Sequence, residues 1–299
     1  MEILLAGASG LIGGSLAAAL KDDGHRPIRL VRRAAKGQDE ITWDPKSGIL
    51  DAQSLDGADA VINLSGAGVG DKRWNDEYKK LVMSSRTRAT SLLATALAEL
   101  PSPPKTLISG SAIGFYGDRG DEILTEESEP GATFLADVCQ NWETAAQPAI
   151  DAGIRTAFLR TGIVQTPAGG ALKKLLPLVK FGLGGKFGSG EQYMSWITMT
   201  DQINAIKYLL SSDLSGPINL TAPNPVTNAT FVRTLGTVLK RPTILPVPPF
   251  GPRLLLGQEL ANALLFDSAR VLPMALTDHG FRFEHNDLEA GLRAEIQGS

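Results

Sequence analysis

The sequence predicts an α/β protein with a doubly wound parallel sheet and a small C-terminal lobe. Short apolar runs alternate with helical patterns over residues 1–164, which is typical of a parallel sheet covered by helices on both faces. Beyond residue 165 this alternation stops and glycine-rich and proline-rich segments appear. We therefore expect a sheet domain over residues 1–164. Residues 165–299 should mostly form the lobe, with a segment near 217–220 returning to the sheet.

The chain opens on a predicted strand, a tight turn and a helix. The apolar residues 3–6 lead into Gly7-Ala8-Ser9-Gly10-Leu11-Ile12-Gly13, and a helical pattern follows. Gly7 permits the turn, Gly10 lets the backbone approach a phosphate, and Gly13 lets the helix pack on the strand. A helix N-terminus also suits a pyrophosphate. This Rossmann-like arrangement favours a dinucleotide cofactor over an unliganded glycine-rich turn. The expected contacts are Gly7, Ser9, Gly10, Leu11, Ile12 and Gly13.

Two arginines follow the second predicted strand, residues 27–31. In NAD-binding proteins of this architecture an acidic residue near this point holds the ribose 2′-hydroxyl. Here Arg32 and Arg33 stand in its place, and a guanidinium grips a phosphate with two parallel hydrogen bonds. We therefore predict NADP(H) rather than NAD. The alternative is a solvated basic loop.

Small residues end the strand predicted over residues 58–64. The segment Ser65-Gly66-Ala67-Gly68 comes directly after it. Ligands of doubly wound sheets lie beyond the carboxyl ends of the strands, so Leu64, Ser65 and Gly66 are expected cofactor contacts. A simple turn is the alternative.

The remaining elements follow from periodicity, caps and breakers. In the first part we expect a short strand at 40–43, a helix at 76–100, a strand at 106–109, a helix at 134–150 and a strand at 155–159. In the lobe we expect a helix at 170–181, a glycine-rich loop at 182–190 and an extended segment at 195–197. A helix to residue 210, capped by Thr200 and Asp201, and a helix at 228–239, capped by Thr227, should follow. We then expect a non-helical segment at 242–252, a helical segment at 254–266 and a last helix at 287–296.

Composition narrows the possible classes of protein. The chain has 299 residues, 43% of them hydrophobic, and a net charge of -3, which gives no reason to expect nucleic acid or an anionic membrane as a partner. Cys139 is the single cysteine, so no internal disulfide can form. No apolar run is long enough for a membrane span, and a strand starting at residue 2 leaves no room for a signal peptide, so we expect a cytoplasmic protein. The histidines lack metal-ligand spacing, and we predict no metal.

Several motifs lie along the whole chain. They are Gly7-Ala8-Ser9-Gly10-Leu11-Ile12-Gly13, Ile41-Thr42-Trp43, Asn63-Leu64-Ser65-Gly66, Ser85-Arg86, Ser111-Ala112, Tyr116-Gly117, Trp142-Glu143, Arg160-Thr161-Gly162-Ile163-Val164, Gly184-Gly185 with Gly188-Ser189-Gly190, Ser195-Trp196-Ile197 and Gly280-Phe281. Together they resemble the atypical and extended short-chain dehydrogenase/reductases, and most closely the epimerase-family group of YfcH-like and SDR39U1-like proteins. The resemblance implies a Rossmann-like NADP-binding domain, with Arg32, Arg33, Leu64, Ser65 and Arg86 as cofactor contacts. Arg160, in one of these motifs, is a further cofactor candidate.

The catalytic pair of that superfamily, Tyr-x-x-x-Lys, is missing. None of the four tyrosines has a lysine four residues later. Ser111 matches the loop serine that hydrogen-bonds the reacting oxygen in the epimerases, although it could equally be a turn serine. Tyr116 is a second catalytic candidate, with a substrate-shaping role as the alternative. We expect Asp137 and Glu143 to be solvated helix carboxylates, and Cys139 to serve packing.

Two functions therefore stay open at this stage. The first is an NADP(H)-dependent oxidoreductase or epimerase that acts on a small polar substrate, for example a sugar-like one. The second is an NADPH-binding regulatory or sensor protein without turnover. The intact glycine loop favours the first hypothesis and the missing Tyr-x-x-x-Lys favours the second. The sequence predicts neither the substrate nor the oligomeric state.

Overall fold

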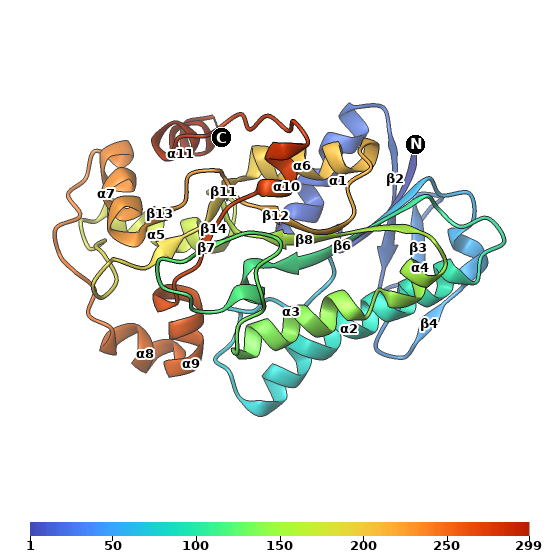
Figure 1. Cartoon of the computed structure of the whole chain (residues 1–299), viewed down its shortest axis with the longest axis horizontal. Coiled ribbons are helices and arrows are strands. Elements are labelled where there is room, and N and C mark those ends of the chain that lie inside the picture. Colours follow the sequence, from blue (N-terminus) through green and yellow to red (C-terminus); the bar gives the residue numbers. More distant parts are fainter. Residues whose placement is uncertain (299) are drawn as a thin grey trace.

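A computed structural model describes residues 1–298, and an eight-stranded sheet lies at its centre (Figure 1). The spatial order is β12-β8-β6-β5-β1-β2-β3-β4. All neighbours are parallel except β3 and β4, so the predicted doubly wound α/β class is confirmed. The strands are β1 (Glu2–Ala6), β2 (Arg26–Val31), β3 (Glu40–Asp44), β4 (Ile49–Leu50), β5 (Ala60–Asn63), β6 (Thr106–Ala112), β8 (Arg155–Thr161) and β12 (Gly216–Leu220).

Helices cover both faces of this sheet (Figure 1). On one face, Leu16 and Leu209 belong to a core that also contains Leu5 and Ile218 of the sheet. On the other face, Leu97 packs in a second core with Trp43. The first face carries α1 (Leu11–Asp22), α6 (Met199–Ser211) and α10 (Met274–Asp278), and the second carries α2 (Asp76–Ala98), α3 (Phe134–Thr144) and α4 (Gln147–Asp151).

A third core holds much of the C-terminal lobe together. Trp196 is fully buried there among apolar residues of three helices, such as Phe231 and Leu292. Three two-stranded sheets add to the lobe and to its junction with the main sheet. These elements are α5 (Gly170–Lys180), α7 (Asn228–Leu239), α11 (Leu288–Gln297), β7 (Ile123–Leu124) with β14 (Arg270–Val271), β9 (Ile163–Gln165) with β11 (Trp196–Thr198), and β10 (Tyr193–Met194) with β13 (Val226–Thr227). The short pieces are η1 (Ala52–Leu55), η2 (Ile113–Tyr116), α8 (Phe250–Leu256), α9 (Gln258–Ala261) and η3 (Asn262–Phe266).

Three details of the lobe and its flanks differ from the sequence predictions. The helix expected over 134–150 is two helices, α3 and α4, because Pro148 cannot donate a backbone hydrogen bond to the preceding turn. The helical segment expected over 254–266 begins earlier, at Phe250, and is interrupted at Gly257, whose φ is 87°, before α9 and η3 continue it to Phe266. The segment 242–252, expected to be non-helical, is helical over its last three residues. Pro252 is tolerated there because it lies in the first turn of α8, where no intrahelical N–H bond is needed.

The cap of α6 also differs from the prediction. Thr198, not Thr200 or Asp201, is the N-cap, and its hydroxyl accepts a hydrogen bond from the Asp201 backbone N–H at 3.1 Å. The cap of α7 is confirmed, since Thr227 accepts from the Thr230 N–H. Within residues 1–298, no helix has the length and apolar character needed to cross a membrane.

Candidate active site

The glycine loop between β1 and α1 is closely packed. Gly7 has a φ of 83°, and a Cβ built there would lie 2.7 Å from the Leu64 carbonyl carbon. A Cβ on Gly13 would lie 2.2 Å from the Gly7 carbonyl oxygen, so the helix approaches the turn at a distance that only glycine allows. Gly10 is the N-cap of α1, with no side chain capping the helix. A Cβ on Gly10 would meet only the Gly7 oxygen, at 3.2 Å, so the outer side of Gly10 is open backbone.

A cleft of about 1110 Å³ lies at the carboxyl ends of β1, β2 and β5. It brings together eight of the residues predicted to contact a cofactor. Leu11, Ile12 and Gly13 form the first turn of α1, and Arg86 and Arg160 lie elsewhere; none of these five lines the cleft. The lining residues among the predictions are Gly7, Ser9, Gly10, Arg32, Arg33, Leu64, Ser65 and Gly66.

The two arginines predicted to hold the 2′-phosphate, Arg32 and Arg33, have different surroundings. Both terminal nitrogens of Arg33 donate to the Glu40 carboxylate at 2.7 Å, and Arg29 approaches the same carboxylate at 3.2 Å. The hydrogen bond from Arg33 is the main reason that the pKa of Glu40 falls to about 2. Arg32 is exposed and has no carboxylate partner within residues 1–298. Of the two, Arg32 therefore has the uncommitted guanidinium.

Arg86 is buried against the backbone at Gly66. Its Nη1 donates to the Val82 carbonyl at 2.9 Å, and its guanidinium lies 5.0 Å from the ring centre of Trp142. A Cβ on Gly66 would lie only 3.1 Å from the guanidinium carbon. Burial lowers the pKa of Arg86, and among residues 1–298 no carboxylate forms an ion pair with it. A cation thus lies directly behind the backbone that lines the cleft.

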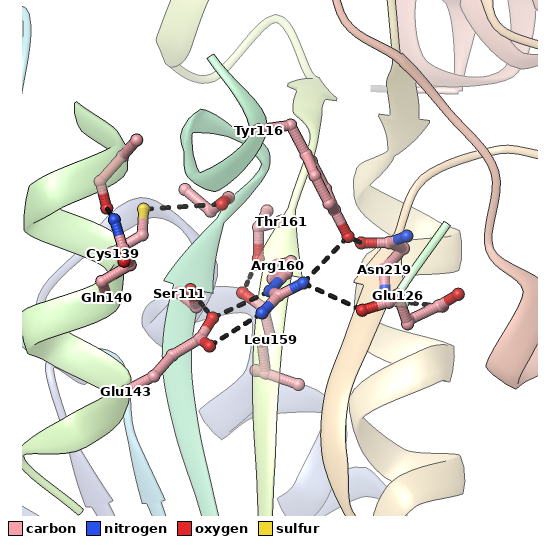
Figure 2. A network of polar contacts seen from close by, with 12 residues as sticks. Ser111, Tyr116, Glu126, Cys139, Gln140, Glu143, Leu159, Arg160, Thr161 and Asn219 are labelled. Carbon is pink, nitrogen blue, oxygen red and sulfur yellow. Dashed lines mark hydrogen bonds and ion pairs between the residues drawn. The ribbon is translucent and has the colours of Figure 1, made fainter. Parts of the chain in front are cut away.

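Ser111 belongs to a polar network at the same edge of the sheet (Figure 2). Its hydroxyl donates to Glu143 at 2.6 Å. The Glu143 carboxylate also accepts from Nε and Nη2 of Arg160, both at 2.9 Å. Burial opposes the charge on Arg160, but the hydrogen bonds and attraction of Glu143 outweigh it and raise the pKa of Arg160. The expectation that Glu143 is a solvated helix carboxylate is wrong: its side chain is only 12% exposed.

Tyr116 lies at the opposite side of Arg160 in this network (Figure 2). It is fully buried. Its hydroxyl donates to the Asn219 side-chain oxygen at 2.7 Å and accepts from Arg160 at 3.1 Å. Burial raises the pKa of Tyr116. The phenol is thus directed into the protein, and a catalytic role for it stays a prediction.

Two members of the network were not predicted from the sequence. The Glu126 carboxylate accepts the backbone N–H groups of Asn219 and Ala275 at 3.0 and 3.2 Å. Burial raises the pKa of Glu126. The side chain of Asn219 donates to the Leu272 carbonyl at 2.9 Å. No local sequence signal identifies these residues, because their partners are far away along the chain.

Cys139 adjoins the network but packs as a buried thiol. Its sulfur lies 3.5 Å from the Ala112 carbonyl oxygen, and burial raises its pKa to about 11. Asp137, two residues earlier on α3, is exposed as expected. The helix where the superfamily carries Tyr-x-x-x-Lys therefore contributes one buried carboxylate, Glu143, to the site.

A doubly wound sheet, a glycine loop after its first strand and a cleft beyond the strand ends define a Rossmann-like nucleotide-binding protein. The chain belongs to the NAD-dependent epimerase/dehydratase family, whose model matches residues 3–220. Residues 247–295 match a domain of unknown function, DUF1731.

Individual relatives agree with this assignment. Epimerase family protein Mb2239 of Mycobacterium bovis is 42% identical over 97% of this chain and 96% of the relative. The crystal structure of human epimerase family protein SDR39U1 with NADPH has a TM-score of 0.91 at 30% identity, with 100% of both chains covered. The nucleoside-diphosphate sugar epimerase of Corynebacterium glutamicum has a TM-score of 0.78 at 39% identity, covering 99% of this chain and 58% of that one. The resemblance to SDR39U1-like proteins is thus confirmed.

Proposed function

We propose that this protein binds NADP(H) in the cleft and acts as an oxidoreductase or epimerase on a small polar substrate. The open backbone at Gly10 and the uncapped N-terminus of α1 suit a pyrophosphate. Leu64, Ser65 and Gly66 line the cleft opposite. The human relative with 30% identity was crystallised with NADPH, which supports the choice of cofactor.

In this proposal the protein prefers NADP(H) to NAD(H) because it recognises the 2′-phosphate. Arg32 supplies the free guanidinium, whereas Arg33 is held by Glu40 and would act mainly by keeping the loop in place. The bound nicotinamide supplies a hydride acceptor or donor. The residues of the chain must then bind the substrate and transfer the proton to or from the substrate oxygen.

The proposed path for the substrate proton begins at the hydrogen bond between Ser111 and Glu143. Because Glu143 is ion-paired with Arg160, it accepts and Ser111 donates. The lone pairs of the Ser111 oxygen are then available to a donor on the substrate, such as a hydroxyl group. In alcohol oxidation, Ser111 would take the hydroxyl proton while its own proton passes to Glu143. The reverse transfer would protonate the oxygen during carbonyl reduction, so this pair would replace Tyr-x-x-x-Lys.

The first experiment compares stabilisation of the protein by NADPH, NADP, NADH and NAD in a thermal shift assay. Stabilisation by the phosphorylated pair alone is expected. Stabilisation by none of the four would contradict cofactor binding and, with it, the proposed enzyme.

The second experiment tests the proton path. Alcohols with NADP and carbonyl compounds with NADPH form the substrate panel. For any substrate found, Ser111→Ala should lower turnover about tenfold or more with little change in NADP affinity. The substitution Asp137→Asn, on the exposed side of α3, the helix that carries Glu143, is the control and should leave turnover unchanged. Equal turnover of wild type and Ser111→Ala would remove Ser111 from the mechanism.

An NADPH-binding regulatory protein without turnover is the second candidate. It is favoured by the missing Tyr-x-x-x-Lys and by the low exposure of Ser111, 5%. Tight NADPH binding with no oxidation across the whole substrate panel would favour it over the enzyme. The two candidates share the cleft and differ only in whether Ser111 meets a substrate.

A further inference from the structure

Exposed apolar side chains are concentrated in one part of the lobe. Eight large hydrophobic residues are 60% exposed or more, and seven of them lie in two short segments, 181–183 and 244–255. The eighth, Ile49, belongs to β4 at the far edge of the sheet. Exposed apolar patches of this kind mark interaction sites. The seven residues are Phe181, Leu183, Ile244, Leu245, Phe250, Leu254 and Leu255.

Backbone contacts hold these two segments next to each other. The Val247 N–H donates to the Lys186 carbonyl at 2.8 Å, and the Gly188 N–H donates to the Val247 carbonyl at 3.0 Å. Arg241 donates from its side chain to the Lys180 carbonyl at 3.1 Å. The second segment continues directly into α8, which has no buried residue and lies at the edge of the molecule (Figure 1). The apolar side chains therefore share one region, and no other part of residues 1–298 covers them.

The same region is strongly basic. Residues 170–190 and 240–257 contain seven lysines and arginines and no aspartate or glutamate, although the whole chain has a net charge of -3. Lys180, Lys186, Lys240, Arg241 and Arg253 are exposed. None of these five forms an ion pair within the described part of the chain, residues 1–298. We call these five cations and the seven apolar residues the apolar–basic surface.

We infer that the apolar–basic surface binds the face of an anionic lipid bilayer. Peripheral proteins place apolar side chains at the headgroup boundary and flank them with lysine and arginine. The exposures here, 60 to 84%, are those of protruding side chains rather than of a groove shaped for one partner. A second copy fits poorly, because a two-fold contact through this surface would bring its unpaired cations together. The sequence expectation of no membrane contact rested on net charge, which averages over this region.

Vesicle co-sedimentation of the full-length protein tests the inference. The probes are phosphatidylcholine vesicles with and without about a third of phosphatidylglycerol. Binding should be at least about tenfold stronger with the anionic lipid and should fall as salt is raised, because salt screens exposed charges. Binding that is equal for both vesicle types, or absent from both, would overturn the inference.

Paired substitutions locate the contact. Phe181→Ser with Ile244→Ser removes two of the most exposed apolar groups, and Lys180→Glu with Lys186→Glu reverses two charges. Each pair should lower vesicle binding by about tenfold or more. The controls, Ile49→Ser and Lys105→Glu, change exposed residues elsewhere and should bind like wild type. All variants should keep the wild-type thermal unfolding temperature, because the altered side chains are exposed.

Oligomeric state separates lipid binding from self-association. Light scattering of the protein without lipid should show the same mass for wild type and the Phe181→Ser, Ile244→Ser variant. A wild-type oligomer that this variant dissociates would assign the surface to a second copy and overturn the lipid inference.

Discussion

Replacing Glu143 by leucine should lower the free energy of unfolding by about 3 kcal/mol. The Glu143 and Arg160 side chains are 12% and 5% exposed, and two hydrogen bonds of 2.9 Å join them. Removing one member of a buried ion pair leaves an uncompensated charge, which costs about 3–5 kcal/mol. We expect the lower end of this range because Arg160 keeps the Tyr116 hydroxyl and the Glu126 carbonyl as acceptors. Its guanidinium also keeps its contact with the Phe115 ring, at 3.4 Å.

The assay is urea unfolding of wild type, Glu143→Leu, Arg160→Met and the double variant. The double variant should be at least about 2 kcal/mol more stable than the sum of the two single losses predicts, because neither charge then remains unpaired. Asp137→Leu on the exposed face of α3 is the matched control and should change stability by less than about 1 kcal/mol. Single losses that simply add would refute the claim that the pair is energetically coupled.

Three further predictions concern the cleft. Arg32→Ala should weaken NADP binding about tenfold or more in calorimetry and leave NAD binding unchanged. Equal losses for both cofactors would contradict the 2′-phosphate assignment. Gly13→Ala should lower the free energy of unfolding by more than about 2 kcal/mol, because its Cβ would lie 2.2 Å from a backbone oxygen. Gly14→Ala, whose Cβ would lie 3.7 Å from the nearest atom, should be neutral or stabilising by up to about 1 kcal/mol. Similar urea midpoints for the two variants would count against this packing. The pKa of Glu40 is lowered from 4.5 to about 2, so its contribution to stability is present above pH 4.5 and is lost as the pH falls toward 2. Glu40→Gln should lack this part of the acid dependence. Parallel pH–stability curves for the variant and wild type would refute this contribution of Glu40.

The features predicted correctly from the sequence are local ones. The turn at Gly7 and the cap at Thr227 depend on neighbouring residues, so a short window contains the information. The doubly wound class follows from alternation over the first half of the chain. The errors at Pro148 and Gly257 were also local, because each residue interrupts a helix that periodicity alone would continue.

The polar network could not be predicted in the same way. Glu143 has the sequence context of an exposed helix carboxylate, and its burial depends on Ser111 and Arg160, which are 32 and 17 residues away. The sequence similarly suggests that Arg33 is free to bind a phosphate, whereas in the fold Glu40 lies beside it and accepts its hydrogen bonds. Such pairings depend on which strands are neighbours and in which register. In this sheet Ser111 lies opposite Arg160 across β6 and β8, a fact of register that no motif contains.

The network that positions Ser111 also fastens the C-terminal segment to the sheet. Asn219 accepts from Tyr116 and donates to the Leu272 carbonyl, and Glu126 binds the backbone N–H groups of Asn219 and Ala275. A substitution of Arg160 therefore changes stability and the site together, and lost turnover in such a variant would not identify a chemical role.

Ser111 lies at one end of the network, and its hydroxyl donates to Glu143. Ser111→Ala leaves the ion pair between Glu143 and Arg160 intact, so we expect a stability loss of only about 1 kcal/mol in urea unfolding. A large loss of turnover beside that small loss of stability would mean that the missing hydroxyl carried the proton. A stability loss as large as that of Glu143→Leu would mean instead that Ser111 supports the structure, and the proton path would have to begin elsewhere.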